Sequence, residues 1–507
     1  MAAAAGLAAA ELVAGIDRRL SSPILDVGDR VVDSVPSEVK QLAIAWFGTN
    51  DKKALLIGIG VILTIYAVAV GILWLRHDRR LGVAGVAAFG ILGSAAALSS
   101  RVQVPWWSVA PSVVGVLVAG GVLVLFASAT QPRPVGSSVE AGGRGGCRAM
   151  ELPSARRRFL VAAAVVTAGA GLMAAGGRRL AARFSAADSR RAVVLPAPAT
   201  NLRPVPADAS AAGASPFFTP NRSFYRIDTA LTVPQVPAET WSLVVGGMVD
   251  RSLEISYDEL LARPLIESDI TLTCVSNEVG GDLVGNARWL GARLDDLLAE
   301  AGISPGADQV VGRSVDGYTC GFPVSALDGR DAMVAVAMNG EPLPLAHGFP
   351  ARLVVPGLYG YVSATKWLTE IELTRFDRFD QYWAPRGWDT QAPIKTQSRI
   401  DTPRGLARVA AGVVPLAGVA WAQTRGIRAV ELQVDDGPWL PTRLASEVNV
   451  STWRQWWLAW EATPGRHTLT VRATDGTGAI QTAERSEPMP NGATGQHQIV
   501  VLVDEAP

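Results

Sequence analysis

The chain has 507 residues, of which 49% are hydrophobic and 18% charged, with 46 basic and 46 acidic side chains. This composition excludes a disordered chain, and the zero formal charge offers no basic field for holding nucleic acid. Cys147, Cys274 and Cys320 are too few for a disulfide framework and form no CxxC or Cys/His cluster for zinc. We therefore expect no nucleic-acid partner and about three structural units.

The first third of the chain carries the apolar residues. Four uncharged runs approach or exceed the roughly 20 residues that cross a hydrocarbon core, and we predict a transmembrane helix at each: 54–75, 81–100, 109–129 and 159–177. A transmembrane region over 54–177 would then follow an N-terminal tail, residues 1–53. Buried core helices of a soluble domain are the alternative interpretation.

The positive charges predict the orientation of these helices. Arginines gather after the first run and before the fourth, which indicates two cytoplasmic loops: Arg76, Arg79, Arg80, Arg133, Arg144, Arg148 and Arg156–Arg158. Four crossings then place both the tail and everything after residue 177 outside the cytoplasm. Lys52 and Lys53 before the first run, and five arginines after the fourth, weigh against this orientation.

Arg156, Arg157 and Arg158, followed by Phe159 and a weakly hydrophobic run, resemble a twin-arginine export signal. That pathway moves folded domains, so the charge rule for unfolded loops does not constrain it, and folding first fits a cofactor loaded in the cytoplasm. We expect the signal to stay uncleaved as an anchor in the cytoplasmic membrane, with the catalytic part outside. A basic stop at the end of an ordinary helix is the alternative.

The remainder of the chain changes character. A Pro/Ala-rich stretch predicts an extended linker over 178–216, and mixed strand and helix patterns predict an α+β domain over 217–395. Residues 396–507 are nearly all strand-like and separated by turn residues, which predicts a small β-sandwich. The individual expectations are strands at 241–245, 270–273, 409–423, 427–434, 453–461, 466–474 and 496–503 and a helix at 293–301.

Two segments contain side chains suited to chemistry. Cys274 ends a strand-like run before Gly280 and can serve as a soft metal ligand, a nucleophile or a buried structural residue. His347, Arg352 and Lys366 lie among Gly and Pro residues, a composition typical of anion-binding loops on a rigid scaffold. The chain has no GxGxxG after a strand and no GxxxxGK[ST], so a nucleotide cradle is not indicated.

These motifs, in order, resemble the sulfite oxidase family of molybdopterin enzymes. The resemblance spans roughly 217–503 and rests on Phe-Thr-Pro-Asn ending at Asn221, on Cys274, on Asn-Gly-x-Pro-Leu-Pro and His-Gly-x-Pro-x-Arg over 339–352, and on Lys366–Trp367. Residues 400–507 resemble the family's immunoglobulin-like dimerisation domain through 418–421, 453–456 and 472–475, which implies a possible homodimer. The membrane region lies outside the resemblance.

The resemblance implies that a molybdenum–molybdopterin cofactor (Moco) binds here, with Cys274 as the protein thiolate on molybdenum. It implies further contacts to the pterin or its phosphate from these residues: Asn221, Phe224, Tyr225, His347, Arg352, Ser363, Thr365, Lys366 and, more weakly, Asp316. A structural role for His347 and surface roles for Arg352 and Lys366 are the alternatives.

The substrate is expected to be neutral. Sulfite oxidases carry basic residues where this chain has Pro220 and Val279, and Glu278 adds a negative charge, so a sulfite anion would lose its partners. The Phe-Thr-Pro-Asn start is similar to that of bacterial members that reduce protein methionine sulfoxide, which favours a small or protein-bound S-oxide or N-oxide. Tyr382, Arg386 and Trp388 are candidates for the substrate funnel or for packing at the domain junction.

Electrons must pass to or from a partner outside the predicted spans. The four predicted spans contain no histidine, and His77 lies at a helix end, so we expect no heme and an external electron-transfer partner or quinone-linked chain. Two alternatives to a membrane-anchored S-oxide or N-oxide enzyme remain open. One is a sulfite oxidase or dehydrogenase, and the other is a non-catalytic membrane-anchored scaffold that retains the fold.

Overall fold

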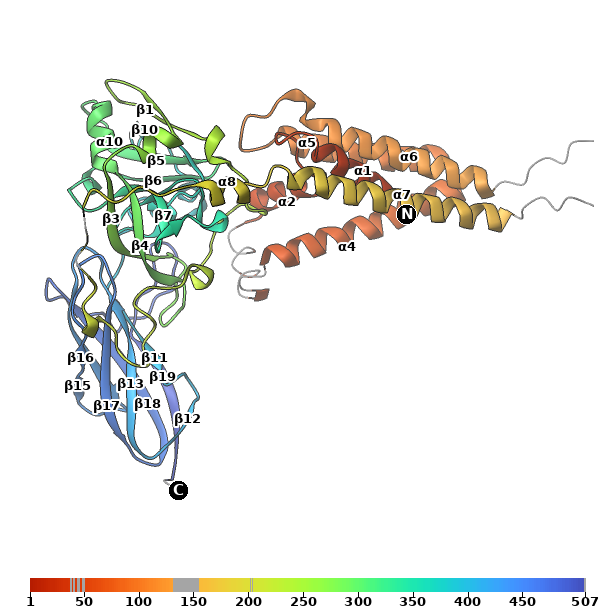
Figure 1. Ribbon diagram of the computed structural model, residues 1–507. Helices are drawn as coiled ribbons and strands as arrows, with labels where there is room; N and C mark the ends of the chain where they lie inside the picture. Colours follow the sequence, from red (N-terminus) through yellow and green to blue (C-terminus); the bar gives the residue numbers. More distant parts are fainter. Residues whose placement is uncertain are drawn as a thin grey trace, which may run out of the picture. The chain divides into compact units, whose positions relative to one another are not determined.

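The computed structural model describes residues 1–36, 51–130, 155–200, 202 and 204–505, together with Val39, Leu42, Trp46 and Phe47. These residues form two compact units (Figure 1). One comprises Met1–Ser185 with Ala230–Thr232, and the other Ala186–Thr229 with Val233–Pro507. Cys147 and the predicted loop arginines Arg133, Arg144 and Arg148 lie outside the described residues.

The first unit is helical. Its long helices coincide with the four predicted runs: α4 (Asp51–Ile72) with the π-helical turn η2 (Leu73–His77), α5 (Arg79–Leu98), α6 (Ala110–Thr130) after η3 (Trp106–Val109), and α7 (Ala155–Ala182). By length and composition, all four are apolar enough to cross a membrane. Only 11% to 28% of each apolar window is buried inside the structure, so most of these side chains keep part of their surface exposed. Helices that are part of a soluble core would bury them instead.

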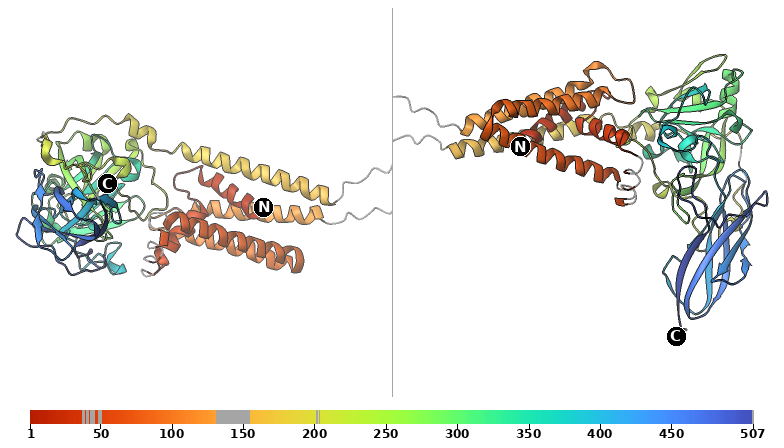
Figure 2. Two further views of the ribbon diagram at one scale, coloured as in Figure 1. Left: turned by 90° about the horizontal axis from the view of Figure 1, so that it is seen from below. Right: turned by 180° about the vertical axis from the view of Figure 1, so that it is seen from behind.

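The first residues differ from the expected tail. They form α1 (Ala2–Ala14) and α2 (Pro23–Ser34), and α1 lies against α6 and α7 (Figure 2). Small residues allow this close approach, since a Cβ on Gly6 would lie 2.5 Å from the carbonyl oxygen of Gly115. Helix α1 has 13 alanine-rich residues, which is too short to cross a membrane. The search for transmembrane runs in the sequence therefore did not indicate this helix.

The expected linker over 178–216 also differs. Helix α7 continues to Ala182, α8 (Ala187–Ala192) follows, and the extended residues after it lie along the second unit. The Ala199 N–H donates to the Leu265 carbonyl at 2.7 Å, and the Ser215 N–H donates to Asp401 Oδ2 at 2.8 Å. A Pro/Ala-rich segment suits a free tether, but its unpaired backbone groups can equally pair with a sheet edge.

The second unit contains the predicted α+β domain, built on two sheets. The first sheet has the order β2 (Leu253–Ser256), β1 (Ser242–Gly247), β10 (Leu368–Thr374), β5 (Gln309–Ser314), β6 (Thr319–Pro323). The second has the order β3 (Leu265–Thr273), β4 (Val284–Arg293), β7 (Met333–Met338), β8 (Glu341–Pro342), with β9 (Arg352–Val354) paired to β7. Short helices connect them: α9 (Tyr257–Leu261), α10 (Leu294–Ala301) and α11 (Gly360–Ser363). Residues of both sheets share one core, including Ile270, Trp289, Val310 and Leu368. The strand expected at 241–245 and the helix at 293–301 are confirmed within two residues, and the strand expected at 270–273 is the end of β3, which begins five residues earlier, at Leu265.

Two further sheets form the C-terminal part, drawn in blue in Figure 1. One has the order β11 (Gln397–Thr402), β13 (Gly412–Trp421), β17 (Arg454–Ala462), β16 (Arg443–Leu444). The other has the order β12 (Arg408–Ala410), β19 (His497–Asp504), β18 (Gly465–Asp475), β14 (Ile427–Val434), β15 (Trp439–Pro441). Leu416 and Trp456 of one sheet share a core with Leu432, Val471 and Val501 of the other, as in a β-sandwich. Four of the five expected strands are confirmed. The run expected at 409–423 is divided between β12 and β13, which belong to different sheets. The immunoglobulin-like character stays a prediction.

Candidate functional site

A cavity in the second unit brings most of the predicted site residues together. It has about 780 Å³ of empty volume, part of which is open to solvent. Seven predicted residues line it: Phe224, Tyr225, Cys274, Asp316, His347, Arg352 and Lys366. These residues come from β9, from strand ends and from loops up to 142 positions apart in sequence, between Phe224 and Lys366.

Cys274 follows the last residue of β3. The turn after it is fixed by the Cys274 N–H, which donates to the Leu283 carbonyl at 2.9 Å, and by the Asn277 N–H, which donates to the Cys274 carbonyl at 3.1 Å. The thiol is 7% exposed, and burial raises its pKa, although hydrogen bonds from Ser276 partly oppose this. Cys274 and Cys320 are both free thiols, so a disulfide between them does not explain either residue.

Arg352 places a buried positive charge at the cavity. Its guanidinium donates to the carbonyls of His347 at 3.2 Å and Ala364 at 3.3 Å, and it lies over the Trp289 ring. Among the residues that the structure describes, no carboxylate lies within ion-pair distance of it. Burial lowers the pKa of Arg352 to about 10. A desolvated charge without a counterion is costly, so this arrangement fits an anionic ligand.

Lys366 is the second cation of the cavity, and it is already paired. Its Nζ donates to Asp228 Oδ2 at 2.7 Å and to the Ala346 carbonyl at 3.4 Å. Burial lowers the pKa of Lys366 to about 8, and Asp228 opposes that shift. Asp228 itself lines the cavity, is 4% exposed at its side chain and also contacts Arg226. No spacing in the sequence links Asp228 to Lys366, so its place at the site could not be predicted.

His347 ends the 3₁₀ turn Leu345–His347, and Gly348 continues the chain at a φ of +107°. Burial lowers the pKa of His347 to about 4, with further contributions from Arg352 and Lys366. The ring is therefore neutral near pH 7. Its Nε2 lies 3.0 Å from the Asn221 carbonyl, which assigns the ring hydrogen to Nε2 as donor.

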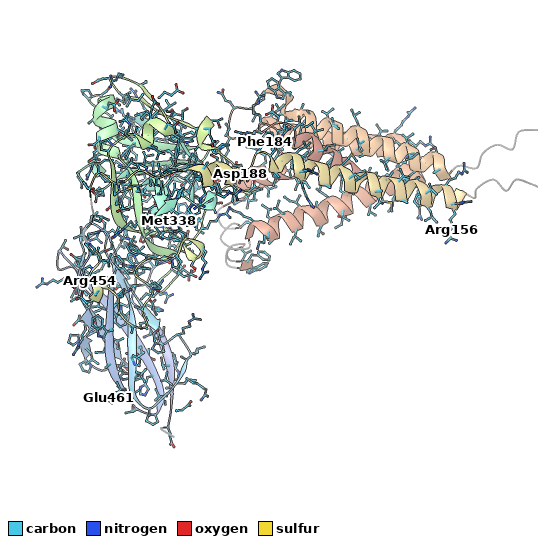
Figure 3. All side chains as sticks on the ribbon, viewed as in Figure 1. Arg156, Phe184, Asp188, Met338, Arg454 and Glu461 are labelled. Carbon is cyan, nitrogen blue, oxygen red and sulfur yellow. The ribbon has the colours of Figure 1, made fainter. Side chains whose placement is uncertain are left out.

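Three predicted residues have side chains that do not line the cavity. Asn221 Nδ2 donates to the carbonyl of Met338 (Figure 3) at 3.1 Å and to Glu341. Ser363 Oγ donates to the Leu358 and Tyr359 carbonyls at 3.1 and 3.0 Å, and Thr365 Oγ1 donates to the Gly312 carbonyl at 3.4 Å. In this structure these side chains hold the backbone around the cavity, which differs from the direct contact that we expected.

Aromatic and acidic groups line the rest of the cavity. Tyr318, Tyr361 and Trp383 line it together with Ser314 and Asp316. The Tyr318 N–H donates to Asp316 Oδ1 at 3.2 Å, and the Tyr318 hydroxyl donates to the Tyr361 carbonyl at 2.6 Å. Burial raises the pKa of Tyr318 well above its usual value, with smaller contributions from Cys320, Asp316 and Cys274. Tyr318 lies two residues after the predicted Asp316, so the sequence could have indicated it. No motif in the sequence indicated Trp383.

The predicted funnel residues lie behind Trp383. The rings of Tyr382 and Trp388 are centred 5.1 and 6.2 Å from that of Trp383, and the Arg386 guanidinium stacks on Tyr382 at 3.8 Å. None of Tyr382, Arg386 and Trp388 lines the cavity. They pack against Trp383 of its aromatic wall. This favours the packing role over a place in the substrate funnel.

The prediction of a neutral substrate rested on Pro220, Glu278 and Val279. None of the three lines the cavity, and Pro220 and Glu278 are exposed. Their spacing from the cysteine and the asparagine predicted that they face a substrate. The charge at the site must therefore be judged from the lining residues.

A metal at Cys274 would have to bring its own ligands. In the described ranges, no three or more His, Cys, Asp and Glu residues are grouped to hold a metal ion. A single thiolate is a soft but incomplete ligand set. A buried thiol, two buried cations and aromatic walls together fit a metal held by an organic, anionic cofactor such as Moco.

Known proteins are similar to the part of the chain that contains this cavity. The family model "Oxidoreductase molybdopterin binding domain" matches residues 230–383. Mitochondrial sulfite oxidase of Homo sapiens is 31% identical over 303 residues, which cover 50% of this chain and 55% of that protein. The "Uncharacterized oxidoreductase YuiH" of Bacillus subtilis is 34% identical over 148 residues, 29% of this chain and 72% of that protein. The chain thus spans about half the length of the mitochondrial sulfite oxidases that it matches.

A solved structure shares the fold. The sulfane dehydrogenase SoxCD from Paracoccus pantotrophus aligns with a TM-score of 0.51 and 21% identity, covering 59% of this chain and 85% of that chain. Fold and site together define a molybdopterin-dependent oxidoreductase. The chain belongs to the sulfite oxidase family.

Proposed function

We propose that this protein is a membrane-anchored molybdoenzyme that binds Moco through Cys274 and transfers an oxygen atom to or from a neutral S-oxide or N-oxide. The observation that supports it most is the cavity, in which a buried free thiol lies with a buried Arg352 that has no carboxylate partner in the described chain. When bound, the cofactor supplies two-electron oxygen-atom transfer. The chain supplies binding, orientation and the electrostatic surroundings.

Different residues of the cavity would bind different parts of the cofactor. Arg352 and Lys366 would hold the phosphate of the cofactor, the arginine through its planar donors and the lysine as a point charge. Neutral His347 and the stacked pair Phe224–Tyr225, whose rings are 5.2 Å apart, would flank the pterin. Asn221, Ser363 and Thr365 would act indirectly, by fixing the backbone that carries these groups.

The neutral substrate follows from the cations that line the cavity. Arg352 and Lys366 are the cations of this lining, and the phosphate of the cofactor would engage both. The remaining wall offers Tyr318, Tyr361 and Trp383, and Asp316 can only repel an anion. An anionic substrate would be desolvated without a partner, whereas a sulfoxide or thioether can contact aromatic rings favourably. Sulfite oxidation is the second candidate, because the mitochondrial sulfite oxidases are among the matching relatives.

Substrate assays on the purified holoenzyme test this choice. We expect reduction of methionine sulfoxide, dimethyl sulfoxide or trimethylamine N-oxide with a reduced viologen, and slow or absent sulfite oxidation with ferricyanide. Trp383→Ala should raise the KM for the sulfoxide up to about tenfold, since a sulfur–aromatic contact contributes roughly 0.3–1.5 kcal/mol. Trp388→Ala is the control, because its ring touches Trp383 but does not line the cavity. Sulfite turnover at about hundreds per second with a micromolar KM would instead assign the protein to sulfite oxidation.

Membrane anchoring is part of the proposal, supported by the four long apolar helices. We infer that residues 178–507 lie outside the cytoplasmic membrane and are exported folded by the twin-arginine route. Arg156 is the second residue of α7 and is exposed (Figure 3). The external electron partner and the homodimer remain further parts of the proposal. The non-catalytic scaffold stays the alternative, and molybdenum content separates it from the enzyme.

The export route has its own test. Replacing both Arg156 and Arg157 by Lys should keep the second unit in the cytoplasm, where protease added to spheroplasts cannot cleave it. Replacing Arg178 and Arg179 by Lys, at the other end of α7, is the matched control and should leave cleavage unchanged. Unchanged cleavage of the first variant, or normal export in a strain without the twin-arginine translocase, would refute this route.

A further inference from the structure

The strand that ends at Cys274 lies at the edge of its sheet. β3 pairs with β4 on one side and is the first strand in the order of its sheet. Its other edge therefore presents backbone groups that need partners from outside the sheet. The start of this edge is paired by the Ala199 N–H, which donates to the Leu265 carbonyl.

The C-terminal sandwich pairs the half of this edge that approaches Cys274. Asn449 Nδ2 donates to the Asp269 carbonyl at 3.0 Å, and the Thr271 N–H donates to the Ser451 carbonyl at 3.0 Å. Gln423 Nε2 then donates to the Thr271 carbonyl at 3.0 Å and to Thr273 Oγ1 at 3.2 Å. These contacts follow one edge, one every second residue, and end one residue before the cysteine.

The side chain of Thr271 forms buried hydrogen bonds both to the C-terminal sandwich and to strand β4. It is fully buried, its hydroxyl accepts from the Trp453 N–H at 2.7 Å, and it donates to Asn286 Oδ1 at 3.0 Å. Gln423 is also fully buried, and its Oε1 has no hydrogen-bond partner in the described part of the chain. The polar contribution of Gln423 therefore comes from the two bonds that its Nε2 donates to β3.

The turn after Cys274 is held from the same side. Arg399 Nη1, on β11, donates to the Gly281 carbonyl at 2.8 Å. The ring of His497, on β19, lies so close to Gly280 that a Cβ there would overlap it, and Gly280 has a φ of +80°. Sandwich residues thus contact Thr273, directly before the cysteine, and Gly280 and Gly281 in the turn that follows it.

We propose that the C-terminal β-sandwich positions the Cys274 thiol, with Gln423 as the central positioning residue. This rests on the proposed function, in which Cys274 is the molybdenum ligand. Groups that orient a ligand also tune the metal it holds, because they fix the direction of its donor atom. The module would then act on the site in addition to any role in dimerisation.

Gln423→Met tests this, because methionine keeps the approximate volume and removes both donors. The control is Gln481→Met, a buried glutamine whose hydrogen bonds stay within the sandwich, to Ser398, Ala473 and Gly495. In the cofactor-free full-length protein in detergent, hydrogen exchange across 269–274 should quicken about tenfold in Gln423→Met and stay unchanged in Gln481→Met. In the loaded protein, the Mo(V) electron paramagnetic resonance spectrum should shift in Gln423→Met alone, at equal molybdenum content.

The two readouts separate the possible failures. Exchange and spectrum that match the wild type in Gln423→Met, or equal changes in both variants, would overturn the positioning role. Absence of molybdenum from the wild-type protein would refute the proposed function, while the exchange result would still decide the contact with β3. If Gln423→Met does not fold, the half-buried Asn449→Ala should quicken exchange over 269–271 by a smaller factor, and no change in it would also overturn the proposal.

Discussion

Replacing Cys274 by serine is expected to lower turnover by about 1,000-fold, a loss of roughly 4 kcal/mol in transition-state stabilisation. A hydroxyl is a harder and weaker donor than a thiolate, so it alters both the ligation and the potential of the metal. Arg352 and Lys366 would still hold the phosphate, and cofactor content should fall much less than activity. Steady-state rates and metal analysis on the same preparation measure the two effects.

Cys320→Ala is the matched control for this change. Cys320 is equally free and fully buried, but it does not line the cavity, and its thiol contacts Thr365 and Gly312 instead. We expect turnover within about a few-fold of wild type, with a stability loss typical of a small core truncation. Near wild-type turnover in Cys274→Ser, or equal damage in both variants, would contradict the ligand assignment.

Arg352→Met is expected to lower cofactor content about tenfold or more while leaving the cofactor-free protein nearly as stable as the wild type. The buried guanidinium has carbonyl partners but no carboxylate among the described residues, so its removal leaves no counter-charge unpaired. The cofactor, in contrast, loses a charged hydrogen-bond donor set. Pterin content and thermal unfolding of the cofactor-free protein measure the two quantities.

Lys366→Met provides the contrast, because it removes one partner of a buried ion pair. Asp228 would keep its buried charge and lose its 2.7 Å ion pair with Lys366, so the free energy of unfolding should fall by roughly 3 kcal/mol. Both variants should contain less cofactor than the wild type. In the cofactor-free state, only Lys366→Met should be less stable than the wild type. Equal stability losses in the two cofactor-free variants would show that Arg352 has a structural role and not a ligand-binding one.

The apolar helices and the sandwich strands could be predicted closely, because each has a strong local pattern. A run such as 54–75 is long and uncharged, and strands such as 466–474 are bounded by turn residues. The N-terminal helix α1 has no such pattern, since its stability comes from Gly6 and its alanines packing on α6. The contacts that the expected linker makes with the second unit could not be predicted for the same reason. Its hydrogen-bond partners, such as Leu265, belong to another part of the chain.

The site shows a similar division. Cys274, His347, Arg352 and Lys366 could be identified from the order of their motifs, and the cavity brings all four together. Asp228 and Trp383 reach the cavity only through tertiary folding, which no spacing in the sequence expresses. Asn221 lies in the expected place, but its side chain bonds to Met338 and Glu341, because rotamer choice depends on neighbours that the sequence does not identify.

The central claim is that this chain binds Moco at Cys274. Metal and pterin analysis of the full-length protein, purified from a host that makes the cofactor, tests it most directly. We predict about one molybdenum and one molybdopterin per chain, with both reduced in Arg352→Met. A protein that contains neither, while a sulfite oxidase purified in parallel from the same host is fully loaded, would contradict the account and favour the non-catalytic scaffold.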